Sequence, residues 1–155
     1  MKLLFKQRLF SWFDSYDIYN ENMQTVFTVQ GKLAWGHLLE IYDRNHNHAA
    51  TLKERVLTFL PKFEIYIGGQ MIGEVKKEFT LFKPSFSLSC NDWQVDGDFW
   101  EWDYKITSNG KMIATIEKQL FNWTDTYVID VFHPQDSLLA LMVVLAIDAV
   151  KCSGE

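Results

Sequence analysis

The stretch that most constrains this chain is an unbroken run of ten apolar residues, Leu138 to Ile147. Leu, Met and Ala outnumber the β-branched residues in this run, which favours a helix over a strand. We therefore predict a helix from Asp136 to Lys151. A helix that is apolar on every side has no face to offer to water, so it must be buried.

A membrane is a poor place for this helix. Its sixteen residues reach ~24 Å, and the apolar run is about half of the ~20 residues that usually span a bilayer. We therefore predict that the helix is enclosed by its own chain, with Leu138, Leu141 and Leu145 in the core. Asp148 follows the run near the helix C-terminus, where the helix dipole disfavours an anion. We expect Asp148 to form an ion pair with a Lys or Arg of the enclosing chain.

The preceding residues predict about a dozen short strands separated by turns. The predicted strands are Lys2–Arg8, Ser15–Tyr19, Thr25–Gly31, His37–Tyr42, Ala49–Phe59, Phe63–Ile67, Met71–Phe79, Ser85–Leu88, Trp93–Val95, Trp102–Thr107, Lys111–Phe121 and Thr126–Val131. Gly68-Gly69 is the clearest hairpin turn, because two glycines suit the tight turns that join antiparallel strands. His133-Pro134 ends the last strand.

These strands form repeated hairpins. The segment 63–79 matches the segment 104–120 with a constant offset of 41 positions, and weaker copies occur at 16–32 and 39–53. Such repeats indicate a radial or closed β architecture. Eight strands fill a barrel with their own side chains, whereas eleven or twelve leave room for a helix ~10 Å across. The sequence thus predicts a mainly β fold, a closed antiparallel barrel of about twelve strands around the C-terminal helix, in one domain over residues 1–155. A propeller would leave the helix without a place.

Composition limits the functional classes. The chain has 20 acidic and 15 basic residues, a net charge of −5, so it lacks the long-range attraction that draws basic proteins to nucleic acid or anionic lipid. We expect no nucleic-acid partner and weak binding, at most, to anionic vesicles. Two cysteines and an N-terminus without a long apolar run predict reduced thiols in a cytoplasmic protein.

Several motifs carry a resemblance to a known family. They are Leu4-Phe-Lys-Gln-Arg8, Asp125-Thr-Tyr-Val-Ile-Asp130, Asp136-Ser-Leu-Leu and Leu145-Ala-Ile-Asp148, together with the repeated hairpins. Over essentially its whole length the chain resembles the LURP-one-related family. That resemblance implies the tubby C-terminal-like and phospholipid scramblase-like fold, a twelve-stranded barrel around a C-terminal helix. Tubby domains are known for phosphoinositide binding and scramblases for calcium-linked membrane association, but neither site maps residue by residue onto this sequence.

A basic residue followed by aromatic residues recurs at the ends of the repeated units. The groups are Arg8 with Phe10, Trp12 and Phe13; Lys32 with Trp35; Lys77 with Phe82; and Lys118 with Phe121 and Trp123. If these corners share one barrel rim, aromatic rings beside cations would suit a lipid interface. Alternatively the aromatics turn inward and plug the barrel end, which is the commoner role of large aromatics. The candidate ligand-binding residues are Arg8, Lys32, Trp35, Lys77, Lys118 and Trp123.

Two other groups of residues could hold a metal. Five carboxylates lie close together at Asp92, Asp96, Asp98, Glu101 and Asp103, but they lack the spacing of an EF-hand loop, which favours a solvated acidic hairpin. His46 and His48 flank Asn47 without an adjacent third ligand, which favours a surface turn. We expect no metal and no cofactor.

The sequence contains no nucleophile elbow, no Gly-rich phosphate loop and no paired zinc ligands. We therefore expect a non-catalytic cytoplasmic module, at most peripheral at a membrane, that binds a phospholipid head group or a protein partner at the barrel rim. The alternative is an enzyme or small-molecule carrier that uses a gap between helix and barrel. The oligomeric state stays open.

Overall fold

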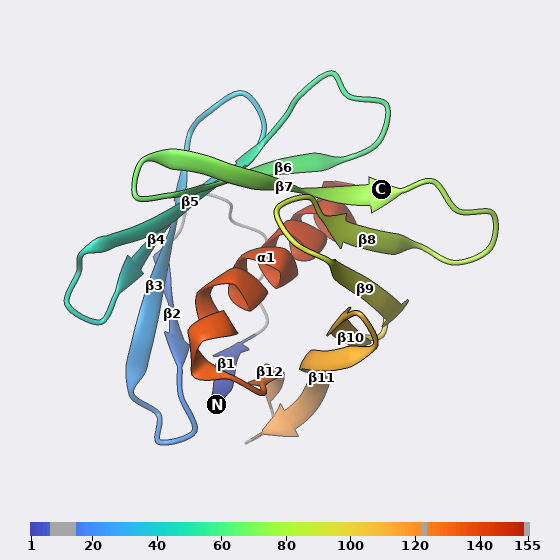
Figure 1. Ribbon diagram of the computed structural model, residues 1–155. Helices are drawn as coiled ribbons and strands as arrows, with labels where there is room; N and C mark the ends of the chain where they lie inside the picture. The colour runs from blue at the N-terminus through green and yellow to red at the C-terminus, as the bar shows by residue number, and fades with distance from the viewer. Residues whose placement is uncertain (7–14, 122–123, 154–155) are drawn as a thin grey trace.

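The computed structural model describes residues 1–6, 15–121 and 124–153. Within these residues twelve strands form one closed antiparallel barrel in the order β1-β12-β11-β10-β9-β8-β7-β6-β5-β4-β3-β2, and α1 passes through it (Figure 1). This arrangement confirms the predicted fold class. The elements are β1 (Lys2–Lys6), β2 (Ser15–Tyr19), β3 (Thr25–Lys32), β4 (Leu38–Asp43), β5 (His48–Glu54), β6 (Lys62–Ile67), β7 (Gln70–Glu78), β8 (Ser85–Leu88), β9 (Trp93–Asp98), β10 (Asp103–Ser108), β11 (Lys111–Phe121), β12 (Thr124–Val131), η1 (Pro134–Asp136) and α1 (Ser137–Ser153).

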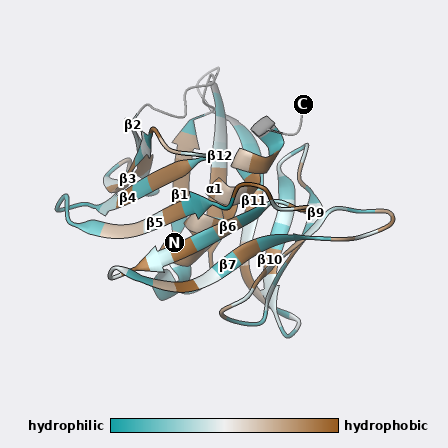
Figure 2. Ribbon diagram, turned by 90° about the horizontal axis from the view of Figure 1, so that it is seen from above, coloured by the Kyte–Doolittle hydropathy of each residue, from teal (hydrophilic) through white to brown (hydrophobic). Residues whose placement is uncertain are grey.

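Helix α1 is the centre of the hydrophobic core. Every side chain from Ala140 to Ile147 is fully buried, including Leu141 and Leu145, and Leu138 is partly buried against the same core. Figure 2 shows the mostly brown, apolar helix within strands that are banded brown and teal. The banding follows from the two-residue period of a strand, which turns alternate side chains toward the helix.

The chain enters the helix through a short 3₁₀ turn. Asp136 belongs to η1, so α1 begins one residue later than predicted, at Ser137. Pro134 opens this turn, where its missing N–H costs nothing, and the Ser137 N–H donates to the Pro134 carbonyl. The chain thereby reverses from β12 into the barrel interior.

The repeated hairpins share one structural device. Ile18, Ile41, Ile65 and Ile106 are each fully buried, and each directly precedes a shift of strand register. An extra residue at such a bulge bends the strand and increases its twist, which helps a sheet to close. The 41-residue offset also aligns the turns. Both residues of Gly68-Gly69 and of Asn109-Gly110 have positive φ, as the tight hairpin turn requires.

Two predicted strands differ clearly in extent. The strand predicted at Trp93–Val95 continues to Asp98 in β9. We predicted a strand from Ala49 to Phe59, but β5 ends at Glu54 and residues 55–61 connect it to β6. Leu57 has a φ of 61°, a left-handed conformation that a strand does not accommodate. Consecutive apolar residues in this connection, such as Val56-Leu57, also break the two-residue period of a strand.

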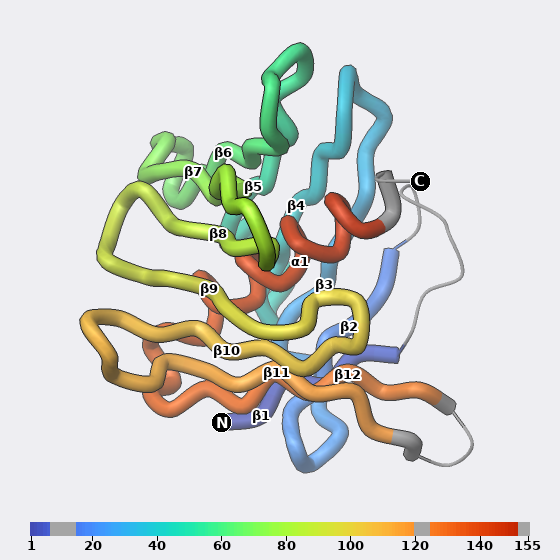
Figure 3. Tube along the Cα trace, turned by 90° about the vertical axis from the view of Figure 1, so that its right-hand side faces the viewer, coloured from blue at the N-terminus to red at the C-terminus, as the bar shows by residue number. Residues whose placement is uncertain are grey.

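The barrel has two different ends. Because successive strands are antiparallel, the connections after β3, β5, β7 and β9 lie at one end, and the turns after β2, β4, β6, β8 and β10 lie at the other. In Figure 3 the long β3–β4 and β5–β6 connections rise together at the top, and the β2–β3 turn lies at the bottom. Helix α1 runs toward the first end, where the Lys151 Nζ lies 3.3 Å from the carbonyl oxygen of Trp100 in the β9–β10 connection.

Candidate functional site: an apolar rim at one end of the barrel

Large apolar side chains gather, exposed, at the end of the barrel where α1 terminates. They come from the connections β3–β4, β5–β6, β7–β8 and β9–β10, and their exposed fractions run from 45% for Val56 to 103% for Leu57. We call this set the apolar rim: Leu33, Trp35, Val56, Leu57, Phe59, Phe79, Leu81, Phe82 and Trp100. Single exposed apolar residues are common on proteins, but a group of this kind usually marks an interaction surface.

The first two connections of the apolar rim are tied together at their base. One carboxylate oxygen of Glu54 accepts a hydrogen bond from the backbone N–H of His37 at 2.8 Å. The same oxygen lies 2.6 Å from the His37 Nδ1. The Glu54 N–H in turn donates to the His37 carbonyl at 2.8 Å. Gly36 has a φ of 83°, and a Cβ there would lie 2.9 Å from a methyl group of Val56. Glycine therefore permits this close approach of the two connections.

Further hydrogen bonds anchor the β5–β6 and β7–β8 connections near their bases. The Arg55 N–H donates to the Lys62 carbonyl at 2.9 Å, and the Lys77 N–H donates to the Pro61 carbonyl at 3.1 Å. In the β7–β8 connection the Thr80 hydroxyl donates to the Lys83 carbonyl. These bonds satisfy the backbone below the tips while the apolar side chains project outward. A partner would thus meet loops that are already ordered, which lowers the entropic cost of binding.

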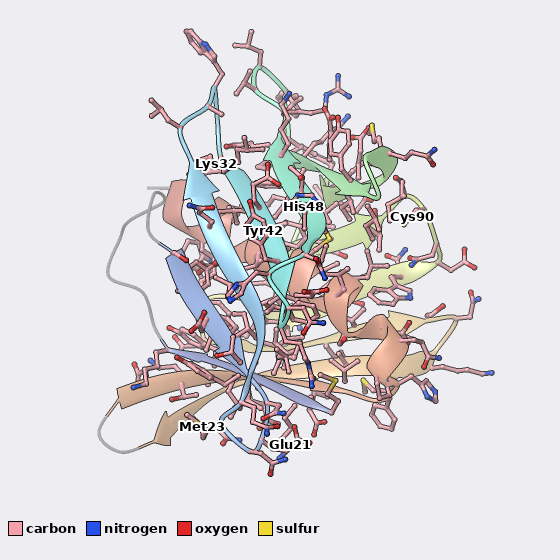
Figure 4. All side chains as sticks on the ribbon, turned by 90° about the vertical axis from the view of Figure 1, so that its left-hand side faces the viewer. Glu21, Met23, Lys32, Tyr42, His48 and Cys90 are labelled. Carbon is pink, nitrogen blue, oxygen red and sulfur yellow. The ribbon has the colours of Figure 1, made fainter. Side chains whose placement is uncertain are left out.

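The predicted rim residues have different outcomes. Trp35 is a member of the apolar rim. Lys32, labelled in Figure 4, is exposed at the end of β3, where the connection that carries Trp35 begins. Lys77 is half-buried in β7, and the Lys118 Nζ forms an ion pair with Asp125 at 2.8 Å. Arg8, Phe10, Trp12, Phe13, Trp123 and the side chain of Phe121 lie outside the described residues.

The alternative that the predicted aromatics plug the barrel end is wrong for the two described ones. Trp35 is 87% exposed and Phe82 is 95% exposed. A different buried aromatic cluster packs in the core near the end of α1, formed by Phe5, Phe86, Phe99, Trp102, Tyr104 and Tyr127. Within it Trp102 stacks on Tyr127 with ring centroids 3.8 Å apart, and the Lys151 Nζ lies 4.2 Å from the Trp102 ring.

Tyr104 is the most unusual titratable group in this cluster. Its hydroxyl is buried and has no hydrogen-bond partner within the described part of the chain. Burial raises the pKa of Tyr104 well above its ordinary value, and the negative charge of Asp148 on α1 raises it further. Asp148 is half-buried, and its expected ion pair with a Lys or Arg stays a prediction.

The two segments that were considered as possible metal sites both form hairpins. The acidic segment forms the β9–β10 hairpin, where the Asp98 carboxylate accepts a hydrogen bond from the Glu101 N–H at 3.1 Å. In the β4–β5 hairpin the His48 Nε2 lies 2.5 Å from a Glu40 carboxylate oxygen, and His46 occupies the turn. No group of three potential metal ligands occurs in residues 1–6, 15–121 and 124–153.

Comparison with known proteins places the chain in a family. A family model described as LURP-one-related matches residues 1–148. The chain belongs to the LURP-one-related family. A relative in this comparison is the uncharacterized protein YxjI of Bacillus subtilis (strain 168), which is 29% identical over 156 residues that cover 100% of this chain and 96% of YxjI. An X-ray structure of a protein from Arabidopsis thaliana is similar with a TM-score of 0.66 and 17% identity, over 95% of this chain and 89% of that one. At this identity the likeness concerns the fold alone.

Three pockets bounded by described residues bear on the carrier alternative, since a carrier would need space beside the helix. None of the three is lined by a residue of α1. The core side chains of this LURP-one-related barrel instead pack directly against the helix. Among the described helices, none combines the length and the apolar character needed to cross a bilayer.

Proposed function

We propose that this member of the LURP-one-related family is a non-catalytic binding module that docks its apolar rim against a phospholipid surface. The observation that carries the proposal is the exposure of nine large apolar side chains at one end of the barrel. Each large side chain moved from water into an apolar environment contributes about 1.5–3 kcal/mol, so partial insertion of a few of them would suffice for reversible association.

The shape of the apolar rim favours a bilayer over a protein partner. Its side chains stand on four separate connections around the end of the barrel rather than along one groove. Trp35, at one tip, is of the type that is enriched at the membrane interface. Lys32 and Lys83 adjoin the apolar tips with exposed side chains that could reach lipid phosphates. A protein partner at the same apolar rim is the second candidate.

The net charge of −5 defines what kind of lipid binding is expected. Attraction to anionic lipid is weak for such a protein, so insertion of apolar side chains must supply most of the binding free energy. Binding to anionic vesicles should therefore be no stronger than binding to zwitterionic vesicles, and binding to zwitterionic vesicles should survive 0.5 M salt.

The test is flotation with phosphatidylcholine vesicles. The wild-type protein should float with the vesicles, and Leu57→Ser or Phe82→Ser should each weaken binding about tenfold, equivalent to about 1.4 kcal/mol. Phe132→Ser is the matched control, because Phe132 is 64% exposed but lies at the opposite end of the barrel. We expect this control to bind as the wild type does.

Two results would contradict the lipid-docking proposal. The first is an equal loss of binding in Phe132→Ser and Phe82→Ser, which would mean that vesicles do not contact the apolar rim. The second is a folded wild-type protein that does not float at any vesicle concentration. Concentration-dependent dimerisation abolished by Leu57→Ser would then assign the apolar rim to a protein interface.

A further inference from the structure

A groove on the outer wall of the barrel suggests a second binding site. It lies beside the junction of β1 and β2, for which the described residues show one pair, Leu4↔Tyr19. The groove has a volume of about 230 Å³. It is separate from the apolar rim, and Figure 4 labels Glu21 and Met23, two of its lining residues, at the opposite end of the barrel from Lys32. We call it the seam groove.

One part of the seam groove is apolar. Leu4 and Val128 are cross-strand neighbours, and Leu4 is also the neighbour of Tyr19. The residues on either side of Val128, Tyr127 and Ile129, are buried in the barrel core, so the strand period turns Val128 outward. Val128 is nevertheless only 6% exposed. Val128 thus adds an apolar but largely covered side chain to the outer wall, beside the partly exposed Leu4.

Met23 lines this apolar part from a well-ordered turn. The Asn20 side-chain oxygen accepts hydrogen bonds from the N–H groups of Asn22 and Gln24, each at 3.0 Å. The Met23 N–H donates to the Asn20 carbonyl at 3.0 Å. Met23 has a φ of 59° and its side chain is 54% exposed. The turn thus holds a flexible, polarizable side chain beside the groove, which is a common feature of adaptable apolar binding sites.

The other part of the seam groove is lined by hydrogen-bond donors. Lys6 is the cross-strand neighbour of Thr126, and Thr126 is the cross-strand neighbour of Gln119, so an ammonium, a hydroxyl and an amide follow one another across three strands. The side chains of Lys6 and Thr126 make no hydrogen bond or ion pair with another residue of the described chain. The Gln119 Nε2, by contrast, already donates to a Glu117 carboxylate oxygen at 3.4 Å. Lys6 and Thr126 are therefore the groups available to an anion.

The Lys2 end of the groove differs from the Lys6 end. A carboxylate oxygen of Glu21 accepts a hydrogen bond from the Lys2 backbone N–H at 3.3 Å. Hydrogen bonds from its own backbone N–H and from that of Lys2 lower the pKa of Glu21, which keeps this carboxylate ionised. The Lys2 ammonium at this end offsets the charge of Glu21 and contributes to lowering its pKa. Lys6, about 13 Å away along β1, has no carboxylate partner among the described residues, so an anionic ligand is attracted more strongly at Lys6.

We propose that the seam groove binds a single-chain amphiphile with an anionic head, such as a medium-chain carboxylate. The head contacts Lys6 and Thr126, and the apolar chain lies over Leu4 and against Met23, beside the largely buried Val128. Charge complementarity sets the direction, because Lys2 shares its end of the groove with Glu21, whereas Lys6 has no carboxylate partner among the described residues. The binding reaction is reversible and needs no chemical step.

The test is a methyl NMR titration of the folded protein labelled at its methionine methyl groups. Decanoate, kept below its micelle concentration, should shift the Met23 signal saturably and leave the Met71 signal unchanged. Met71 is a suitable reference because it is 46% exposed and lies on β7, across the barrel from β1. Decanol should bind more weakly than decanoate, and decyltrimethylammonium more weakly still.

Matched lysine variants test the head-group contact. Lys6→Gln should weaken decanoate binding about threefold to fivefold, the range expected for one exposed ionic contact, and should leave decanol binding unchanged. Lys111→Gln, an exposed lysine outside the groove, should change neither. The proposed lipid docking is independent, so Leu57→Ser should retain decanoate binding.

Three outcomes would overturn the proposal. The first is a parallel shift of the Met23 and Met71 signals, which indicates non-specific surfactant binding. The second is an equal effect of Lys6→Gln and Lys111→Gln on decanoate binding. The third is the absence of any saturable shift of the Met23 signal in the folded protein.

Discussion

Leu141→Ala tests whether α1 is the core of this barrel. Leu141 is fully buried in the middle of the helix. The substitution removes three carbon groups at about 0.8 kcal/mol each and leaves a cavity, so we expect a loss of about 3–4 kcal/mol in the free energy of unfolding. Domains of this kind have about 5–15 kcal/mol in total. The midpoint of thermal unfolding should fall by about 6–16 °C.

The same change at Leu139 is the matched control, because Leu139 lies on the same helix but is only partly buried. Urea unfolding followed by tryptophan fluorescence and by far-ultraviolet circular dichroism measures both variants. Leu139→Ala should cost about half as much as Leu141→Ala. Equal losses in the two variants, or a loss below about 1 kcal/mol for Leu141→Ala, would refute the enclosure of the helix.

Two further predictions concern the β9–β10 region. In urea unfolding, Gly97→Ala should lower the free energy of unfolding at least twice as much as Gly69→Ala. A Cβ at Gly97 would lie 2.6 Å from the Asp103 carbonyl oxygen, whereas a Cβ at Gly69 meets nothing within 4 Å. Similar losses in the two variants would show that β9 and β10 can separate at little cost. Tyr104→Phe should leave stability at pH 7 unchanged or raise it by about 1 kcal/mol, because it removes a buried hydroxyl without a partner in the described chain. Because the pKa of Tyr104 is higher in the folded chain than in the unfolded chain, the folded state binds more protons above about pH 10, and the free energy of unfolding falls as the pH rises through the tyrosine range. Between about pH 9 and 11 it should fall less in Tyr104→Phe than in the wild type; identical pH profiles would contradict this prediction.

The sequence determined the architecture because the architecture depends on local patterns. Ten successive apolar residues require burial on every side, and a repeat of 41 positions aligns the Gly68-Gly69 turn with Asn109-Gly110. Neither pattern depends on the exact residues at which the strands begin and end. The limit of this reasoning appears at residues 55–61, where apolar residues lengthened the predicted strand but belong to an exposed connection. The adjacent apolar residues Val56 and Leu57 were the signal that could have revealed it, since a strand with one buried face alternates.

The binding surfaces depended on the tertiary structure. Leu33, Leu57 and Leu81 are apolar residues that composition alone would assign to the core, and barrel closure brings them together on exposed connections at one end. The seam groove required the pairing of β1 with β12, which places Leu4 beside Val128 across more than 120 positions of sequence. Periodicity along a strand shows which face a residue occupies, but the neighbours across strands are set by register. Register is decided when the whole sheet closes, and so are the surfaces that it creates.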